Sequence, residues 1–241
     1  DKLYFTDKPN YLKEIERDRE WLEVQFSIEL FLLGKPGSIL DVGSGAGTFI
    51  RTAHAEGWKA QGIEPAVETK ALTHDLDIIA DTFENAVFNE RFDAIRLGWV
   101  LEHIRDPHAI LSQCHYLLNE HGKLLIIVPN DFSRLQIAVK KDFYWIHPTH
   151  INYFTNVSLG KLLESHHFKV SVSLATFPME WFLLMGHHYL DNPEIGEMVH
   201  DWRKAMELKL AHEDFSLLME LGGMFATLGI GRDLIVRAEK R

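Results

Sequence analysis

The sequence predicts a single α/β domain built on a doubly wound, seven-stranded sheet that is mostly parallel. Three observations lead to this prediction. Short apolar runs alternate with longer stretches of helical period, which is typical of parallel sheets. A glycine-rich turn follows the first apolar run. The chain has 241 residues, 46% of them hydrophobic and 25% charged, which suits one globular domain with its own core.

The domain is expected to begin with a helical leader over residues 1–36. Apolar residues recur from Tyr11 to Leu33, and Gly34 and Pro36 then end the helical pattern. The core of the domain should span 37–177, a helical insertion 178–230, and the last strand 231–241. The insertion is far longer than the roughly 2–6 residues of an ordinary connection, so it is expected to have a role of its own.

Seven strands are expected where apolar runs are bounded by turn residues, at 38–42, 59–63, 78–80, 92–97, 123–128, 169–174 and 233–238. Helices are expected at 46–56, 66–73, 106–119 and from Thr155 onward. Pro107 and Gly122 support the third of these, because proline favours the first turn of a helix and glycine the position after its end. The insertion reads mostly as helix over 179–228, with breaks at Gly186, Pro193 and Gly222-Gly223.

The strongest local signal is the turn after the first strand, Asp41-Val42-Gly43-Ser44-Gly45-Ala46-Gly47. Glycines there allow a sharp turn and let a ligand approach the backbone without a Cβ in the way. The spacing is Gly-x-Gly-x-Gly, whereas a dinucleotide fingerprint has Gly-x-Gly-x-x-Gly. Asp41 also places a negative charge near the turn, so an ammonium or a neutral polar group suits it better than a pyrophosphate. The alternative is a plain tight turn between a strand and a helix.

A second signal is Glu64, which ends the second strand nineteen residues after Gly45. In doubly wound folds, an acidic residue about 20 residues past the glycines binds the hydroxyls of a ribose. The alternative is a solvated glutamate at a strand end. The joint spacing of the turn and the carboxylate favours a ribose-containing ligand.

Several segments in this order resemble the motifs of class I S-adenosylmethionine-dependent methyltransferases, similar to the ubiquinone-biosynthesis-type subgroup. They are Leu40–Gly47, Gly62–Pro65, Asp81–Phe83, Phe92–Pro107 and Gly122–Asn130, and His147–Thr155 resembles a segment of one branch. The resemblance runs from about Gly37 to Phe168 and resumes at Asp233. It implies a Rossmann-like fold in which the last strand is antiparallel. It also implies S-adenosylmethionine as the cofactor, with S-adenosylhomocysteine as its product.

The resemblance also implies which residues surround the cofactor. The methionine part is expected beside Asp41 and the backbone of Gly43, Ser44, Gly45 and Gly47. The ribose is expected at Glu64 and Pro65, and the adenine at Asp81 with Thr82 or Phe83. Leu97 and Trp99 are expected to line the wall near the sulfonium.

The irregular segment after the fifth strand supplies the candidate catalytic residues, His147 and His150. An imidazole can serve as general base for a hydroxyl acceptor because its pKa lies near the working pH. Candidate substrate-binding residues are His103, Tyr144, Trp145 and Tyr153. Alternatively, the two histidines brace a loop by hydrogen bonds, and His103 packs behind the fourth strand. No metal is expected, because no acidic partner with clear ligand spacing follows the histidines.

Charge and composition narrow the class of partner. The formal net charge is −10 and no dense Lys/Arg run is present, which argues against nucleic acid. No apolar run approaches the ~20 residues needed to span a bilayer, and the single cysteine, Cys114, excludes an internal disulfide. The opening residues lack a secretory pattern, so a cytoplasmic location is expected.

The expected acceptor is a small molecule, with a hydroxyl on a sugar, a lipid-like ring or a secondary metabolite as the methylated group. Two alternatives remain: a catalytically inactive binding partner, and a methyltransferase that acts on protein or RNA. The aromatic residues of the helical insertion could form a lid over the acceptor or a homodimer contact.

Overall fold

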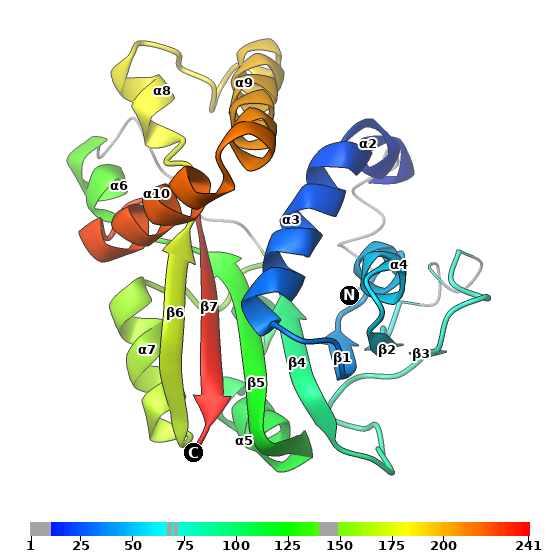
Figure 1. The fold of residues 1–241 in the computed structure, drawn as a ribbon. Helices are drawn as coiled ribbons and strands as arrows, with labels where there is room; N and C mark the ends of the chain where they lie inside the picture. Colours follow the sequence, from blue (N-terminus) through cyan, green and yellow to red (C-terminus); the bar gives the residue numbers. More distant parts are fainter. Residues whose placement is uncertain (1–10, 67–68, 70–71, 140–148) are drawn as a thin grey trace.

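The computed structural model describes residues 11–66, 69, 72–139 and 149–241. Its seven strands are β1 (Ser38–Val42), β2 (Lys59–Ile63), β3 (Ile78–Ile79), β4 (Phe92–Gly98), β5 (Leu118–Pro129), β6 (Phe168–Ala175) and β7 (Asp233–Lys240). They form one sheet in the order β3-β2-β1-β4-β5-β7-β6 (Figure 1). Strands β1 to β5 pair in parallel, and β7 runs antiparallel to both of its neighbours. The predicted doubly wound sheet is therefore confirmed.

Ten helical segments of the described residues accompany the sheet. They are α2 (Tyr11–Arg17), α3 (Arg19–Leu33), α4 (Thr48–Ala55), the 3₁₀ turn η2 (Leu101–His103), α5 (Pro107–Leu117), α6 (Arg134–Val139), α7 (Asn156–Ser165), α8 (Glu180–Leu184), α9 (Pro193–Glu213) and α10 (Phe215–Leu228). The leader, α2 and α3, is helical as predicted. Two expected starts are also confirmed: the Asp106 side chain caps α5, and Thr155 and Ser158 form a capping box at α7.

Side chains alternate along the strands between two hydrophobic cores, one on each face of the sheet. In β5, Leu124, Ile126 and Val128 face the core that includes α5 and α7. Their neighbours Leu125 and Ile127 face the core that includes α3 and α4. Strand β5 is thus covered on both faces, as is typical of parallel sheets.

The helical insertion is confirmed, but one of its predicted breaks is wrong. The structure has α10 running without interruption through Gly222 and Gly223. The break lies earlier, at Asp214, whose side chain accepts the N–H of Leu217 at 3.0 Å and so begins α10. A Cβ on Gly222 would lie 3.4 Å from the Cβ of Leu174, so glycine lets α10 pack close to β6.

The helix expected over 66–73 lies in part outside the described residues, and within the described part Thr69 has 3₁₀ conformation. The N–H groups of Thr69 and Leu72 bond to carbonyls three residues back, as in tight turns. The Thr69 hydroxyl also donates to the Ala66 carbonyl at 2.7 Å, a local bond that competes with helix formation. Among the described residues, no helix has the length and apolar character that a membrane crossing needs.

Candidate functional site: a glycine turn, a ribose-type carboxylate and a polar cluster

The glycine turn joins β1 to α4 with three glycines in the left-handed region. The φ angles of Gly43, Gly45 and Gly47 are 74°, 53° and 74°. The Gly43 N–H donates to the carbonyl of Ile63, the last residue of β2, at 2.8 Å. A Cβ on Gly43 would lie 2.5 Å from Cγ2 of Val100. The turn therefore requires glycine for its conformation, and at Gly43 for space as well.

Glu64 lies at the end of β2 and holds the glycine turn directly. Its carboxylate accepts the N–H of Gly45 at 2.8 Å and that of Ala66 at 2.9 Å, and the residue is 8% exposed. A carboxylate offers about four acceptor positions, so the same group can hold the turn and accept hydroxyl hydrogens. Pro65 follows on the surface. The spacing predicted from sequence is thus a direct contact between the turn and the carboxylate.

Ser44, inside the turn, has a polar atom that indicates a ligand site. The residue is 7% exposed, and within the described part of the chain its buried hydroxyl has no hydrogen-bond partner. Buried hydroxyls are nearly always bonded in native proteins. Three glycines without side chains, an unpartnered hydroxyl and a carboxylate at the adjacent strand end fit the methionine and ribose parts of S-adenosylmethionine.

Asp41 lies in β1 and is 1% exposed. Its Oδ1 accepts from Nη1 of Arg96 at 2.8 Å, and Arg96 also donates to Glu29 of α3. Burial raises the pKa of Asp41, and the charge of Arg96 lowers it again in part. Asp41 therefore belongs to a buried ion pair. Its Oδ2 has no hydrogen-bond partner among the described residues, and this is the atom that could accept from a ligand ammonium.

The residues assigned to the adenine follow β3. Asp81 is exposed, and its Oδ1 accepts the N–H of the half-buried Thr82 at 2.7 Å. Phe83 is 4% exposed and packs in the core with its ring centroid 5.9 Å from that of Phe88. Thr82 is therefore the better placed of the two residues expected beside the adenine ring.

The residues assigned to the sulfonium wall differ in exposure. Leu97 is fully buried in the core, whereas Trp99 is half-buried directly after β4. Trp99 has a φ of 53°, and its N–H donates to the carbonyl of Ile127 in β5 at 2.8 Å. Positive φ is a genuine outlier for a bulky side chain, and such strain clusters at functional sites.

A second group of polar residues lies around Glu102, in η2 beyond the end of β4. Glu102 is 1% exposed, and its backbone carbonyl accepts the N–H groups of Ile151 and Asn152. Burial, reinforced by the charges of Asp233 and Asp131, raises the pKa of Glu102 to about 8. The segment that begins at Thr149 thus returns to the end of β4.

His103 and His150 lie beside Glu102, with ring centroids 4.9 Å apart. Nδ1 of His103 is 3.0 Å from the carbonyl oxygen of Thr149. A carbonyl only accepts, so Nδ1 carries the hydrogen and Nε2 of the neutral ring keeps a lone pair. Ligand atoms of Glu102, His103 and His150 lie within 4.8 Å of one another. They form the group of described residues that could hold a cation.

Part of the predicted acceptor segment lies outside the described residues: His147, Tyr144 and Trp145. Their roles stay predictions. Tyr153 is described, and its ring centroid lies 6.5 Å from that of His150 and 5.7 Å from that of Phe132. Phe132, which follows β5 with a φ of 55°, is 53% exposed and was not expected from the sequence.

Three further polar residues of this region were not among the predicted site residues: Asp131, Glu180 and Tyr189. Each is buried and has a side-chain oxygen without a hydrogen-bond partner in the described part of the chain. Asp131 follows the fifth strand, which is a usable signal because ligands bind at the carboxyl ends of parallel strands. Glu180 and Tyr189 lie in the insertion, where no pattern in the sequence marks them.

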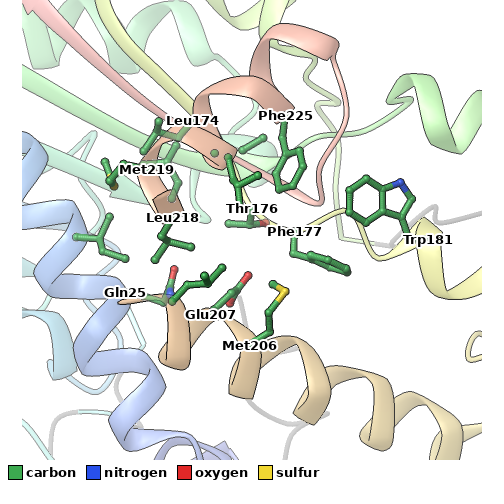
Figure 2. Close-up of a pocket in the computed structure, with 16 residues that line it drawn as sticks. Gln25, Leu174, Thr176, Phe177, Trp181, Met206, Glu207, Leu218, Met219 and Phe225 are labelled. Carbon is green, nitrogen blue, oxygen red and sulfur yellow. The ribbon is translucent and has the colours of Figure 1, made fainter. Parts of the chain in front are cut away.

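An apolar cavity of about 160 Å³ lies between the end of β6 and helices α3, α9 and α10 (Figure 2). Its lining includes Leu174, Phe177, Trp181, Met206, Met219 and Phe225. One buried carboxyl joins the lining, that of Glu207, which accepts from Nε1 of Trp21 at 2.7 Å. Burial raises the pKa of Glu207. The cavity is large enough for one aromatic ring, since an engineered apolar cavity of about 150 Å³ binds benzene.

Comparison with known families gives a match over most of the chain. The family model described as a methyltransferase domain matches residues 15–171. The chain belongs to this methyltransferase family. The resemblance to class I S-adenosylmethionine-dependent methyltransferases that the motifs indicated is thereby confirmed, and S-adenosylmethionine is the cofactor.

Individual relatives agree with the family. The chain is 31% identical over 122 residues to a ubiquinone biosynthesis O-methyltransferase of Glaesserella parasuis, a match that covers 45% of this chain. The chain thus spans about half, 51%, of the length of that relative. Among solved structures, a SAM-dependent methyltransferase from Archaeoglobus fulgidus has a TM-score of 0.63 and 16% identity, over 95% of this chain and 99% of its own.

A second solved structure is a 1,6-didemethyltoxoflavin-N1-methyltransferase from Burkholderia thailandensis, bound to 1,6-didemethyltoxoflavin and S-adenosylhomocysteine. Its TM-score is 0.61 at 17% identity, over 98% of this chain and 85% of its own. At these identities the two structures share the fold with this chain.

Proposed function

We propose that this methyltransferase transfers the methyl group of S-adenosylmethionine to a hydroxyl of a small-molecule acceptor. The observation that carries the proposal is the contact between the Gly45 N–H and the Glu64 carboxylate, within a turn of three left-handed glycines. This contact joins the ends of two adjacent parallel strands, which is where doubly wound folds bind nucleotide-like ligands.

The residues of the cofactor half of the site, from the glycine turn to Trp99, have separate proposed roles. The backbone from Gly43 to Gly47 and the Ser44 hydroxyl bind the methionine part, and Glu64 binds the ribose. Asp81 and Thr82 bind the adenine, and Trp99 bounds the end of β4. The cofactor supplies a methyl group already activated on a sulfonium, so the chain mainly has to orient the acceptor.

His150 is the proposed general base. Its ring lies beside His103 and Tyr153, at the edge of the sheet formed by the ends of β4 and β5. A hydroxyl nucleophile gains from loss of its proton during attack, and an imidazole can accept it at neutral pH. His103, held by the Thr149 carbonyl, orients the neighbouring ring and contacts the acceptor.

A small ring-containing acceptor is supported by the apolar cavity beneath the insertion and by the relatives. The cavity has room for one ring, and the bound ligand of the Burkholderia structure is a small molecule. The Glaesserella relative is described as an O-methyltransferase. The absence of a nucleic-acid partner, a dimer through the insertion and a cytoplasmic location stay predictions.

A thermal-shift titration with S-adenosylhomocysteine tests the proposed cofactor half. A ligand at a hundredfold its Kd stabilises a folded protein by about 2.7 kcal/mol, which moves the melting temperature by several degrees. The wild type should show this shift and Glu64→Ala should lose most of it. No shift in the wild type at millimolar ligand would contradict the proposal.

A further inference from the structure

Four buried oxygen atoms near the acceptor side have no hydrogen-bond partner in the described part of the chain. They are Oε2 of Glu102, Oδ2 of Asp131, Oε2 of Glu180 and the hydroxyl of Tyr189, which we call the acidic cluster. The residues are 1%, 4%, 1% and 7% exposed. A buried polar atom left unsatisfied costs roughly 1–3 kcal/mol. Four together are a sizeable cost for a domain to carry without a function.

The members of the acidic cluster lie close enough to interact electrostatically. Burial, together with the charge of Asp233, raises the pKa of Asp131 to about 6. The charge of Asp233 also raises the pKa of Glu102 and of Glu180. Burial, reinforced by the Glu180 charge, raises the pKa of Tyr189 to about 12. Glu102, Asp131 and Glu180 therefore all lie within electrostatic reach of Asp233, the first residue of β7, and Tyr189 lies within reach of Glu180.

Backbone and side-chain contacts fix this arrangement at one edge of the sheet. Asp233 pairs in register with Pro129, the last residue of β5, and Asp131 follows two residues later. Gln136 of α6 lies near the carboxyl of Glu180 and lowers its pKa, and Nε2 of Gln136 donates to the Asn130 carbonyl at 3.2 Å. The packing of α8 on α6 therefore places Glu180 near the end of β5.

The acidic cluster adjoins the cofactor half through Val100. This side chain fills the space that a Cβ on Gly43 would occupy, and Glu102 follows it by two residues. Glu102 also lies beside His103 and His150. A molecule that reaches the acidic cluster thus lies within reach of both the glycine turn and the proposed base.

A cation that donates hydrogen bonds would best satisfy the unpartnered oxygen atoms of the cluster. The cluster has three carboxyl groups, and Asp233 adds a fourth. Among the described residues, the positive charge of Arg232 lowers the pKa of Glu180 and of Tyr189. A primary ammonium carries three N–H donors and one positive charge. Its hydrogen bonds to carboxylates are stronger than those of neutral donors, which a sugar hydroxyl would supply.

We propose that the acidic cluster binds a primary ammonium group of the acceptor and thereby presents another group of the same molecule for methylation. This inference rests on the proposed function and narrows its substrate class to amine-bearing hydroxyl compounds. A protonated amine has no lone pair, so it serves as an anchor and the methyl group goes to the hydroxyl near His150. The four oxygen atoms then find their donors when the acceptor binds.

The test is a thermal-shift and calorimetric screen with matched probe pairs, in the presence of saturating S-adenosylhomocysteine and EDTA. Tyramine is compared with tyrosol, glucosamine with glucose, and ethanolamine with ethylene glycol. At least one amine should bind the wild type, and its alcohol partner should bind at least about tenfold more weakly, as expected for one charged hydrogen bond. Glu102→Gln and Glu180→Gln should lose the preference for the amine.

The same variants give a second readout that needs no acceptor. Glu102→Gln should raise the melting temperature of the ligand-free protein at pH 9, because it removes a buried group that is costly to ionise. Glu29→Gln is the matched control: Glu29 is also buried but is bonded to Arg96, so this change should lower the melting temperature.

Three results would overturn the inference. One is the failure of all three amines to bind, and another is equal binding of amines and alcohols. The third is stabilisation by Mn²⁺ or Zn²⁺ without EDTA that exceeds that of any amine, which would assign the cluster to a metal ion. Binding of S-adenosylhomocysteine should persist in Glu102→Gln and Glu180→Gln, so the proposed function is judged separately.

Discussion

Replacement of Glu64 by alanine perturbs the one side chain that links the glycine turn to the end of β2. The carboxylate accepts two backbone N–H groups, at 2.8 and 2.9 Å, and is proposed to accept the ribose hydroxyls as well. A hydrogen bond to a charged group contributes about 1.5–3 kcal/mol. Loss of two ribose bonds should therefore weaken S-adenosylhomocysteine binding by about 3 kcal/mol or more, which is about a hundredfold in Kd.

Isothermal titration calorimetry measures this change directly, with two further variants for comparison. Glu64→Gln keeps one oxygen acceptor and should lie between the wild type and Glu64→Ala. Glu90→Ala is the control, because Glu90 is exposed and its carboxylate accepts from Lys59 on the surface. Unchanged affinity in Glu64→Ala, with a wild-type circular dichroism spectrum, would refute the assignment of Glu64 to the ribose.

Four further changes test other parts of the site. Gly45→Val should abolish S-adenosylhomocysteine binding while the chain stays folded, because a left-handed conformation costs a β-branched residue about 1–2 kcal/mol; normal binding by calorimetry would make the turn purely structural. Asp41→Ala leaves the buried Arg96 with one carboxylate, so urea unfolding should show a loss of about 3–5 kcal/mol, and wild-type stability would contradict the buried pair. His150→Ala should lower kcat on a hydroxyl acceptor ~10²–10⁴-fold with cofactor affinity unchanged, whereas wild-type turnover would reduce His150 to a brace for its loop. Burial raises the pKa of Glu102 from 4.5 to about 8, so the folded protein keeps a proton that the unfolded chain loses. Its free energy of unfolding should fall as pH rises through this window, by up to about 5 kcal/mol, and the same decline in Glu102→Gln would exclude Glu102 as its source.

The sheet could be predicted from the sequence because its signals are local. Each strand is a short apolar run between turn residues, and both the glycine turn and the Glu64 position follow from spacing along the chain. The antiparallel pairing of β7 also followed from the resemblance to a known fold. These features need no knowledge of which distant side chains meet.

The errors and omissions have the opposite cause, because they depend on tertiary contacts. Gly222 and Gly223 read as a helix break, but α10 packs so closely on β6 that a small residue is favoured there. The contact expected between Asp41 and the cofactor stays a prediction, but the ion pair of Asp41 with Arg96, 55 positions away, was not expected. Charge pairing across strands cannot be read from one sequence without the register.

The acidic cluster could not be predicted from the sequence for the same reason, because it depends on contacts between distant segments. Glu102 and Asp131 follow neighbouring strands, so their proximity could have been inferred once the sheet order was known. Glu180 and Tyr189 come from the insertion, and nothing in the periodicity of that segment shows that α8 reaches the end of β5. A buried polar side chain on a short helix looks the same in sequence as a solvated one.

The most direct test of the central claim is a methyl-transfer assay with S-adenosylmethionine labelled in its methyl group. The protein is incubated with a metabolite extract, and the label is followed separately in the small-molecule, protein and nucleic-acid fractions. Methyl transfer to a small molecule predicts label in the first fraction, with Glu64→Ala much reduced. Label confined to protein or nucleic acid, or no label above a protein-free control, would contradict it.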